Sequence, residues 1–323
     1  MPCGAFSTDH GAGVIKRTVE ISQHASHLSV RIGQLRIHRH TEDESAPLAA
    51  SITCEDIGII LIDHPQTTMT QQALAALLDS GAAVMVCGRD HLPAGLLLPL
   101  GDHSQIVWRI NEQLAASQPL KKQLWKQVVI AKVRAQAQAV AHDVTVSRKL
   151  NKLATEVKSG DTTNVEAQAA KVYWQAIRNH DAPWAEFRRD PDAADPINGM
   201  LNYGYAVLRA AVARALVAAG LMPALGIHHA NRSNAFCLAD DLVEPLRPMV
   251  DACVRRLVCD EHDQVAKPVK AALLELLQLE VAVGDQRGPL LVALHRYAAS
   301  LVQCFSREAS QLHIPIPVPQ ERG

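Results

Sequence analysis

The sequence predicts an α+β protein in which a small N-terminal β-rich domain, residues 1–104, precedes a larger all-α C-terminal domain, residues 105–323. Two patterns support this division. Apolar residues alternate with polar ones in the first part, and helical spacing dominates from about Gln105 onward. The length of 323 residues favours two domains over one, and a hydrophobic content of 48% is enough for a sizeable core.

Short strands account for most of the first part. Apolar residues alternate with polar ones over residues 17–37, which predicts antiparallel strands with one buried face, joined by a tight turn at Gly33-Gln34. Continuous apolar runs at residues 57–62 and 83–87 predict two strands that are more deeply buried.

The remaining segments of the first part connect these strands. A short helix is predicted at residues 70–80, with Thr70 as its N-cap. The acidic segment 41–45 predicts a loop, and residues 1–14, rich in glycine and alanine, are expected to be frayed. Proline and glycine punctuate segment 91–100, which is expected to end the β region.

Helical spacing of apolar residues runs through most of the second part. It predicts helices at residues 106–117, 119–141, 145–158, 164–179, 200–221, 246–259, 264–281 and 288–308. The segment 179–198, rich in Asp and Pro, predicts a loop. The tail, residues 314–323, alternates proline with aliphatic residues and predicts an extended chain.

The composition and the absence of several sequence motifs exclude some classes of protein. The formal net charge is −1, so a nucleic-acid partner would need a local basic surface. The seven cysteines are odd in number and show no CxxC spacing, which is typical of reduced thiols in the cytoplasm. We expect no signal peptide, because residues 1–13 contain neither a basic nor a long apolar segment, and no membrane association, because Arg209 and Arg214 interrupt the most apolar predicted helix. No P-loop, GxGxxG or GxSxG motif supports nucleotide-cofactor or serine-hydrolase chemistry.

A polar segment, residues 226–248, follows an apolar helix and is one half of a candidate metal site. Its histidines, amides, arginines and carboxylates are His228, His229, Asn231, Asn234, Arg232, Arg247, Asp240, Asp241 and Glu244. Asp241 and Glu244 are spaced i and i+3, so on a helix they would project from one face, although the same spacing also fits a capping arrangement. The two adjacent histidines are either packed residues or ligands, and both interpretations stay open on these residues alone.

Glu166 is the candidate for the missing carboxylate. It lies in the first turn of a predicted helix that Thr162, Thr163 or Asn164 would cap. The helix dipole favours a glutamate at this position even without any further role, so that alternative also stays open. Two glutamates with one histidine would suit Mg²⁺ or Mn²⁺, and such an ion would polarise a phosphoryl oxygen.

Basic residues surround both halves of the candidate site. Those on the predicted helices are Lys121, Lys122, Lys126, Lys132, Arg134, Arg148, Lys149, Lys152, Lys158, Lys171 and Arg178, and the loop that follows adds Arg188 and Arg189. They form either solvated helix faces or a surface that follows DNA phosphates. Our candidates for DNA contact are Lys171, Arg178, Arg232 and Arg247.

Three motifs carry a resemblance to a known family. They are GIHHANRSNAFCLADDLVEPLRP at 226–248, NVEAQAAKVYW at 164–174 and DPINGMLNYGYAVLRA at 195–210, with weaker matches at 119–137 and 91–99. With these motifs the chain resembles the CRISPR adaptation integrases, the metal-dependent nucleases of spacer acquisition, and especially their type II branch. The resemblance extends from about Arg17 to Leu301.

The resemblance implies a fold, a site and a reaction. The family has an N-terminal β domain, which we expect to serve dimerisation, and a helical catalytic domain. Its metal ligands correspond to Glu166, His229 and Glu244, and Asp241 corresponds to an acid with a supporting role. Family members form homodimers, and a small ferredoxin-like partner dimer bridges two of them. The complex inserts a short foreign DNA duplex into a CRISPR repeat by 3′-hydroxyl attack on a phosphodiester, with Mg²⁺ or Mn²⁺ as cofactor.

The resemblance assigns no role to two positions, and three alternative functions stay open. Cys237 stands where type II relatives more often carry asparagine, and neither Cys237 nor His228 is given a role. The alternatives are a non-catalytic DNA-capture subunit, an integrase of a mobile element that lacks a CRISPR array, and a generic all-α metal hydrolase. The intact Glu/His/Glu pattern argues against the capture subunit, and the mobile-element alternative would be favoured by an added DNA-binding domain, which the sequence does not display.

Overall fold

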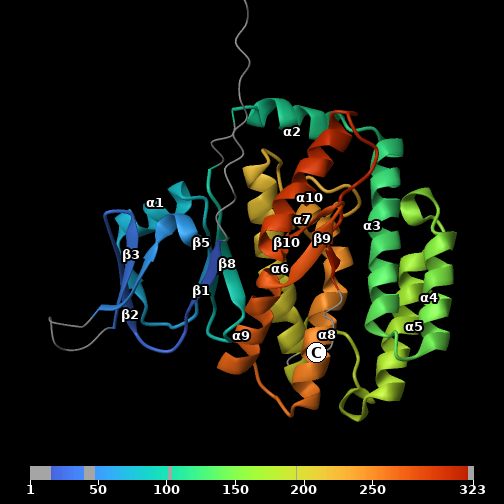
Figure 1. Cartoon of the computed structure of the whole chain (residues 1–323), viewed down its shortest axis with the longest axis horizontal. Helices are drawn as coiled ribbons and strands as arrows, with labels where there is room; N and C mark the ends of the chain where they lie inside the picture. The colour runs from blue at the N-terminus through green and yellow to red at the C-terminus, as the bar shows by residue number, and fades with distance from the viewer. Residues whose placement is uncertain (1–15, 40–47, 101–103, 194, 319–323) are drawn as a thin grey trace, which may run out of the picture.

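The computed structural model describes residues 16–39, 48–100, 104–193 and 195–318. A β-rich part lies beside a larger, mostly helical part, which confirms the predicted fold class (Figure 1). The expectations for residues 1–14 and 41–45 fall outside the described residues.

Two four-stranded sheets build the N-terminal part. One has the order β1 (Arg17–Ile21), β5 (Ile57–Ile62), β7 (Ala83–Cys87), β8 (Pro93–Leu97), and the other has β4 (Leu48–Thr53), β3 (Gln34–Arg39), β2 (Ser26–Arg31), β6 (Thr68–Met69). The hairpin β2–β3 is confirmed, and Gly33 at its turn has a φ of 67°. The prediction for β1 was wrong, because this strand pairs parallel to β5. Alternation reveals which face of a strand is buried but not the direction of its neighbour.

Strands β5 and β7 are buried on both faces, as their continuous apolar runs predicted. Ile59 and Met85 belong to the large core that they share with the helices. Ile60 and Val84 belong to a smaller core between the two sheets and helix α1 (Gln71–Asp79). The side chain of Thr70 accepts a hydrogen bond from the backbone N–H of Ala73, so Thr70 caps α1 as predicted.

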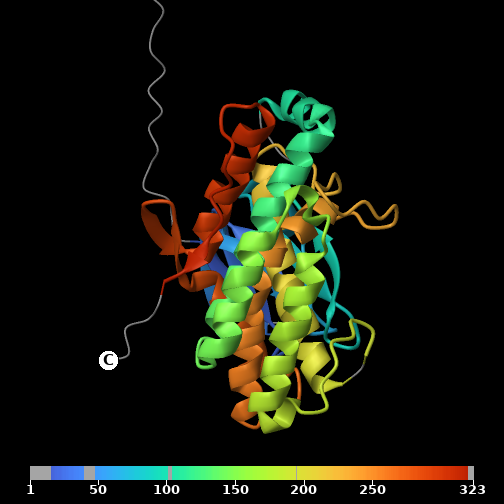
Figure 2. The same ribbon diagram turned by 90° about the vertical axis from the view of Figure 1, so that its right-hand side faces the viewer.

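Nine further helices follow. They are α2 (Ile106–Ala115), α3 (Gln118–Ala139), α4 (Val144–Glu156), α5 (Val165–His180), α6 (Pro196–Ala218), α7 (Cys237–Val243), α8 (Arg247–Cys259), α9 (Lys267–Glu275) and α10 (Leu290–Phe305), within the ranges that the structure describes. Eight of them lie where the apolar spacing predicted helices, and α7 was not predicted. In Figure 2 the green helices α3, α4 and α5 run side by side along one side of the molecule.

The C-terminal part is not wholly helical, which corrects the prediction. Strands β9 (Glu280–Val283), β10 (Gln286–Pro289) and β11 (Ile316–Pro317) form a small antiparallel sheet there. Gly284, with a φ of 58°, lies at the turn between β9 and β10. The apolar residues before this turn fit a helix and a strand equally well, so the predicted helix 264–281 ran too far. The tail is extended at β11, as predicted.

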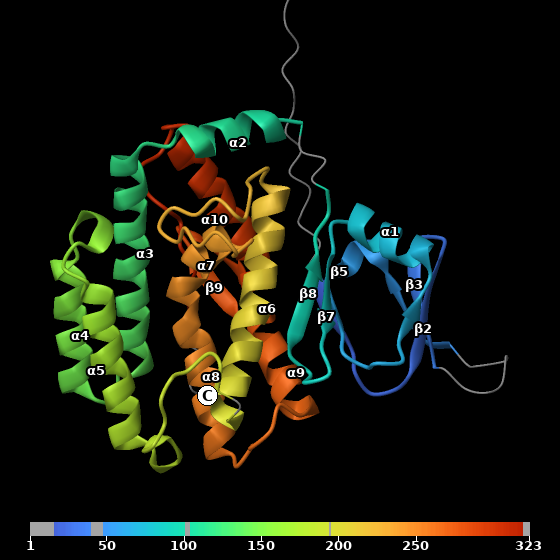
Figure 3. The same ribbon diagram turned by 180° about the vertical axis from the view of Figure 1, so that it is seen from behind.

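Helix α6 is the central element of the helical part. Asp195 caps it by accepting a hydrogen bond from the N–H of Asn198, and most of its side chains are buried. It packs against α7, α8, α9 and α10, and on its other side against β7 and β8, as Figure 3 shows. The two parts are therefore in direct contact, and the predicted boundary at residues 104 and 105 stays a prediction. No helix in the described ranges is both long enough and apolar enough to cross a membrane.

Candidate active site

The loop that carries both histidines is shaped by the carboxylate of Asp241. This side chain is fully buried, and its oxygens accept hydrogen bonds from the backbone N–H groups of Ile227, His228 and His229 at 2.7 to 3.1 Å. Residue 226 must be a glycine for the backbone to pass this close to His229. A Cβ at this position would lie 2.2 Å from the carbonyl oxygen of His229. Asp241 thus fixes the path of the backbone from helix α7.

Asp241 also orients the imidazole of His229. Nδ1 of His229 lies 2.6 Å from Oδ1 of Asp241, which favours the tautomer with the proton on Nδ1 and leaves Nε2 free to bind a ligand. This hydrogen bond raises the pKa of His229 against the opposing effect of burial. A carboxylate behind a histidine is the usual support for a metal-binding imidazole.

Glu166 projects from the first turn of α5. The capping residue is Asp161, whose carboxylate accepts hydrogen bonds from the N–H groups of Val165 and Glu166 at 2.8 and 3.0 Å. Asn164, one of the three predicted caps, does occupy the N-cap position, but its side chain makes no capping hydrogen bond and Asp161 supplies it instead. Asp161 and Asn164 both have positive φ angles, and the tight turn that they form brings the Asp161 side chain to the end of the helix.

Glu244 lies at the junction of α7 and α8. Its carboxylate accepts hydrogen bonds from Lys132 and Arg247 side chains, so it does not serve as the helix cap that its spacing from Asp241 also allowed. Its side chain is 8% exposed. Burial alone would raise the pKa of Glu244, but the two cations outweigh this effect and lower it.

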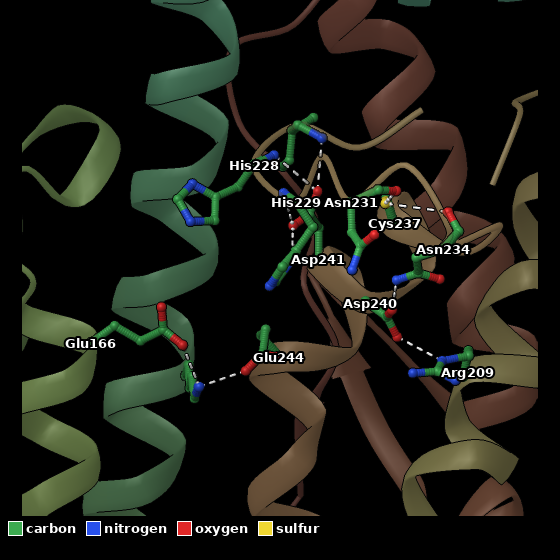
Figure 4. A network of polar contacts seen from close by, with 12 residues as sticks. Glu166, Arg209, His228, His229, Asn231, Asn234, Cys237, Asp240, Asp241 and Glu244 are labelled. Carbon is green, nitrogen blue, oxygen red and sulfur yellow. Dashed lines mark hydrogen bonds and ion pairs between the residues drawn. The ribbon is translucent and has the colours of Figure 1, made fainter. Parts of the chain in front are cut away.

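The ammonium of Lys132 joins the two glutamates. Its Nζ lies 2.5 Å from Oε1 of Glu166 and 2.5 Å from Oε2 of Glu244 (Figure 4). Lys132 comes from α3, so three separate elements meet at this point. Burial would lower the pKa of Lys132, yet the two carboxylates raise it, and the side chain carries its positive charge.

The residues at this site fit a divalent cation. In Figure 4, Glu166 and Glu244 face each other from opposite sides, and the His229 imidazole points toward the space between them. A cationic ammonium already lies between the two carboxylates. Within the described ranges, however, no three His, Cys, Asp or Glu side chains stand at ligand positions around one point. Both carboxylates are held to Lys132 and would have to move to bind an ion together with Nε2 of His229.

A second polar cluster lies behind Glu244, and it was not predicted from the sequence. The buried carboxyl of Asp251 accepts hydrogen bonds from the hydroxyls of Tyr173 and Tyr205. The guanidinium of Arg247 lies 4.5 Å from the ring centroid of Tyr205 and donates to Glu244. Complete burial raises the pKa of Asp251 to about 6. The cluster supports Arg247, and through it the orientation of Glu244.

His228 and Cys237 now have definite surroundings. The exposed imidazole of His228 stacks on the indole of Trp125 from α3, with ring centroids 4.0 Å apart and planes 2° from parallel. Trp125 also meets the edge of the His229 ring. The thiol of Cys237 is buried and lies within hydrogen-bonding distance of the carbonyl oxygens of Asn231 and Asn234, where it helps to close the loop.

The four candidates for DNA contact differ in how exposed their side chains are and in whether they already bond to other residues. Lys171 and Arg232 are exposed. Arg178 is half-buried and donates a hydrogen bond to Gln175. Arg247 is committed to Glu244 and stacked on Tyr205, which leaves it the least available of the four.

Comparison with known proteins identifies the family. The family model described as CRISPR associated protein Cas1 matches residues 19–267. The chain is 37% identical to the CRISPR-associated endonuclease Cas1 of Neisseria meningitidis, over 92% of this chain and 95% of that protein. It is 30% identical to a CRISPR-associated endonuclease Cas1 of Pyrobaculum aerophilum, over 74% of this chain and 84% of that protein.

Solved structures share the fold. A casposase bound to integration product has a TM-score of 0.74 at 20% identity, over 92% of this chain and 93% of that one. A Cas1 protein from Thermotoga maritima has a TM-score of 0.70 at 15% identity, over 90% and 97%. A chain of a Cas6-RT-Cas1–Cas2 complex has a TM-score of 0.73 at 19% identity, over 99% of this chain and 37% of that one.

The chain belongs to the Cas1 family of CRISPR-associated proteins. This confirms the family that the motifs at 164–174, 195–210 and 226–248 indicated.

Proposed function

We propose that this protein is the metal-dependent integrase and endonuclease of CRISPR adaptation. It would insert short foreign DNA into a CRISPR repeat, with Glu166, His229 and Glu244 as ligands of Mg²⁺ or Mn²⁺. The observation that carries the proposal is a pair of glutamates that share one cation, beside a histidine that Asp241 orients, in a chain 37% identical to a Cas1 endonuclease.

The reaction is a transesterification. The oxygen of a 3′-hydroxyl attacks a phosphorus atom of the repeat, a new phosphodiester bond forms, and one existing bond from that phosphorus to a 3′-oxygen breaks. The proton of the attacking hydroxyl is given up, and the departing oxygen gains one. One phosphodiester replaces another, so no nucleotide triphosphate is required. When bound, the divalent ion would polarise the phosphoryl oxygen and favour ionisation of the attacking hydroxyl.

The protein's own residues prepare the site for this step. Asp241 holds His229 with Nε2 exposed, and Arg247 holds Glu244 in a fixed orientation. Lys132 adds a positive charge near the position where the negatively charged phosphate would lie. Holding both DNA segments at this point would supply much of the rate enhancement, because it turns a bimolecular reaction into an intramolecular one.

The partners belong to the same proposal. A structure with the same fold is a complex that contains Cas1 and Cas2. We therefore include a homodimer of this chain, a small Cas2-type partner dimer that bridges two such dimers, and double-stranded prespacer and repeat DNA. Lys171 and Arg232, both exposed, are the candidates best placed to contact DNA phosphates, and Arg178 is a third.

Strand transfer into repeat DNA tests the proposal. A labelled short duplex with free 3′-hydroxyl ends is incubated with repeat DNA, the partner protein and Mn²⁺ or Mg²⁺. We expect Glu166→Gln, His229→Ala and Glu244→Gln each to abolish joined product. Glu156→Ala, an exposed glutamate at the end of α4, serves as the control and should keep full activity. A duplex that ends in 3′-deoxy sugars should give no joined product with any variant.

Retained strand transfer in all three ligand variants would overturn the site. The casposase fold neighbour keeps the mobile-element integrase as a second candidate. Repeat DNA and a scrambled sequence of equal length distinguish the two, since only a CRISPR integrase should prefer the repeat. A protein that binds the duplex but joins no DNA under any metal condition would instead be a capture subunit.

A further inference from the structure

The position of Lys132 bears on how a metal ion could enter the site. Its Nζ lies 2.5 Å from one oxygen of each glutamate, and its side chain is only 11% exposed. The two glutamate oxygens are thus no farther apart than twice that distance. An ion with bonds of about 2.0–2.1 Å to the same two oxygens would lie close to the ammonium, and the two positive charges would repel each other.

Both oxygens of Glu244 are already in use. Oε2 accepts from Lys132, and Oε1 accepts from Nε of Arg247 at 2.8 Å. Each oxygen keeps a second lone pair, but a divalent ion bound there would lie close to one of these cations, whose charge would repel it. Arg247 is held in place, because it lies in the first turn of α8, three residues from Glu244, and stacks on Tyr205. Lys132 ends a flexible four-carbon chain from α3 and is the one that can swing away.

We propose that Lys132 is an internal competitor of the divalent ion. In the metal-free protein its ammonium neutralises two carboxylates that would otherwise repel each other, and the ion must displace it in order to bind. The displaced ammonium stays tethered to α3 beside the site. There it can pair with a phosphate of the proposed DNA substrate. This inference rests on the proposed metal site and assigns Lys132 a role of its own within it.

Binding of Mn²⁺ alone, without DNA, tests this competition. Mn²⁺ affinity is measured by titration calorimetry, and thermal unfolding is followed with chelator and with Mn²⁺. We expect Lys132→Met to bind Mn²⁺ roughly tenfold more tightly or better, because a competing charge is gone. In chelator the same variant should unfold at a lower temperature than the wild type. Addition of Mn²⁺ should raise its unfolding temperature by more than it raises that of the wild type. A residue with only a structural role would not tighten metal binding when it is removed.

Matched variants make the result decisive. Lys126→Met, on the same helix, is the control, since Lys126 forms no ion pair with any residue in the described ranges and should leave both measurements unchanged. Lys132→Gln keeps a neutral hydrogen-bond donor and replaces Lys132→Met if the latter fails to fold. Equal or weaker Mn²⁺ binding in the Lys132 variant overturns the proposed competition.

A double variant separates this inference from the proposed function. Adding Glu166→Gln to Lys132→Met should remove the tight Mn²⁺ binding. Tight binding that survives Glu166→Gln would mean that the ion sits elsewhere, and the proposed ligand set would fail. Binding that depends on Glu166 but not on Lys132 would leave the ligand set standing and overturn the competition alone.

Discussion

Nδ1 of His229 lies 2.6 Å from Oδ1 of Asp241, and the same carboxylate accepts three backbone hydrogen bonds from the loop that carries the histidine. One buried side chain therefore sets both the path of the loop and the orientation of the imidazole. Asp241 is fully buried behind His229 and positions the imidazole, while Glu166 and Glu244 accept hydrogen bonds from Lys132.

Asp241→Asn should weaken metal binding by roughly 10- to 100-fold, the usual effect of losing a hydrogen-bond partner behind a ligand histidine. An asparagine has one acceptor oxygen, and its NH₂ group would face backbone N–H donors, so the loop should also loosen. Mn²⁺ titration together with thermal unfolding measures both effects. Asp240→Asn is the matched control, because Asp240 pairs with Arg209 and Asn234 on the other side of α7. An equal loss of affinity in both variants would contradict this role for Asp241.

Gly226→Ala should lower the free energy of unfolding by about 3 kcal/mol and impair metal binding with it. The new Cβ would lie 2.2 Å from the His229 carbonyl oxygen and 2.9 Å from Oδ2 of Asp241, so the loop must move. Denaturant unfolding measures the cost. Gly95→Ala is the control, since a Cβ on Gly95 would meet no atom within 4 Å. A Gly226→Ala protein as stable as the control would show that the loop adapts freely.

His228→Ala should lower the free energy of unfolding by about 0.5–1.5 kcal/mol, because it removes the ring that stacks on Trp125. His228→Phe keeps an aromatic ring at this position and should restore most of the loss. Strand transfer with both variants separates packing from chemistry. If the stack alone matters, His228→Phe retains strand transfer, whereas inactivity of both variants at wild-type stability would point to a direct role of the imidazole in the reaction.

Long helices were predictable, but short apolar segments were not. Helices α3 and α5 repeat their apolar residues over several turns, and their observed ends lie within a few residues of the predicted ones. Strand β9 has only four residues, too few for alternation to be told from helical spacing. The direction of β1 depends on its partner β5, some forty residues away along the chain, and no local pattern encodes it.

The candidate site was predictable where its residues form dense local motifs. Glu166, His229 and Glu244 stand out because polar residues interrupt apolar segments there. The structure brings Glu166 and Glu244 together on Lys132, and the His229 imidazole points toward the space between them, while their role as ligands stays a prediction. The ion pairs of Lys132 span 34 and 112 residues along the chain, and the sequence places Lys132 only among other basic residues of its helix. Asp251 was missed for the same reason, since its two tyrosine partners come from α5 and α6.

Asp251 should make the stability of the protein depend on pH. Burial raises its pKa to about 6 from an ordinary value of 3.8, so between these values the carboxyl is protonated in the folded protein and ionised in the unfolded chain. Its contribution to stability is complete below about pH 4 and is lost as the pH rises through about 6. The loss amounts to about 3 kcal/mol.

Comparing wild type with Asp251→Asn, which cannot ionise, isolates this contribution. The free energy of unfolding is measured at several pH values between about 4 and about 7, and the difference between the two proteins should shift in favour of the variant as the pH rises. In Tyr205→Phe the carboxyl loses one hydrogen bond that stabilises its ionised form, so the same transition should move to higher pH. A difference between wild type and Asp251→Asn that is constant over this range would mean that the buried carboxyl has the same pKa in the folded and unfolded states.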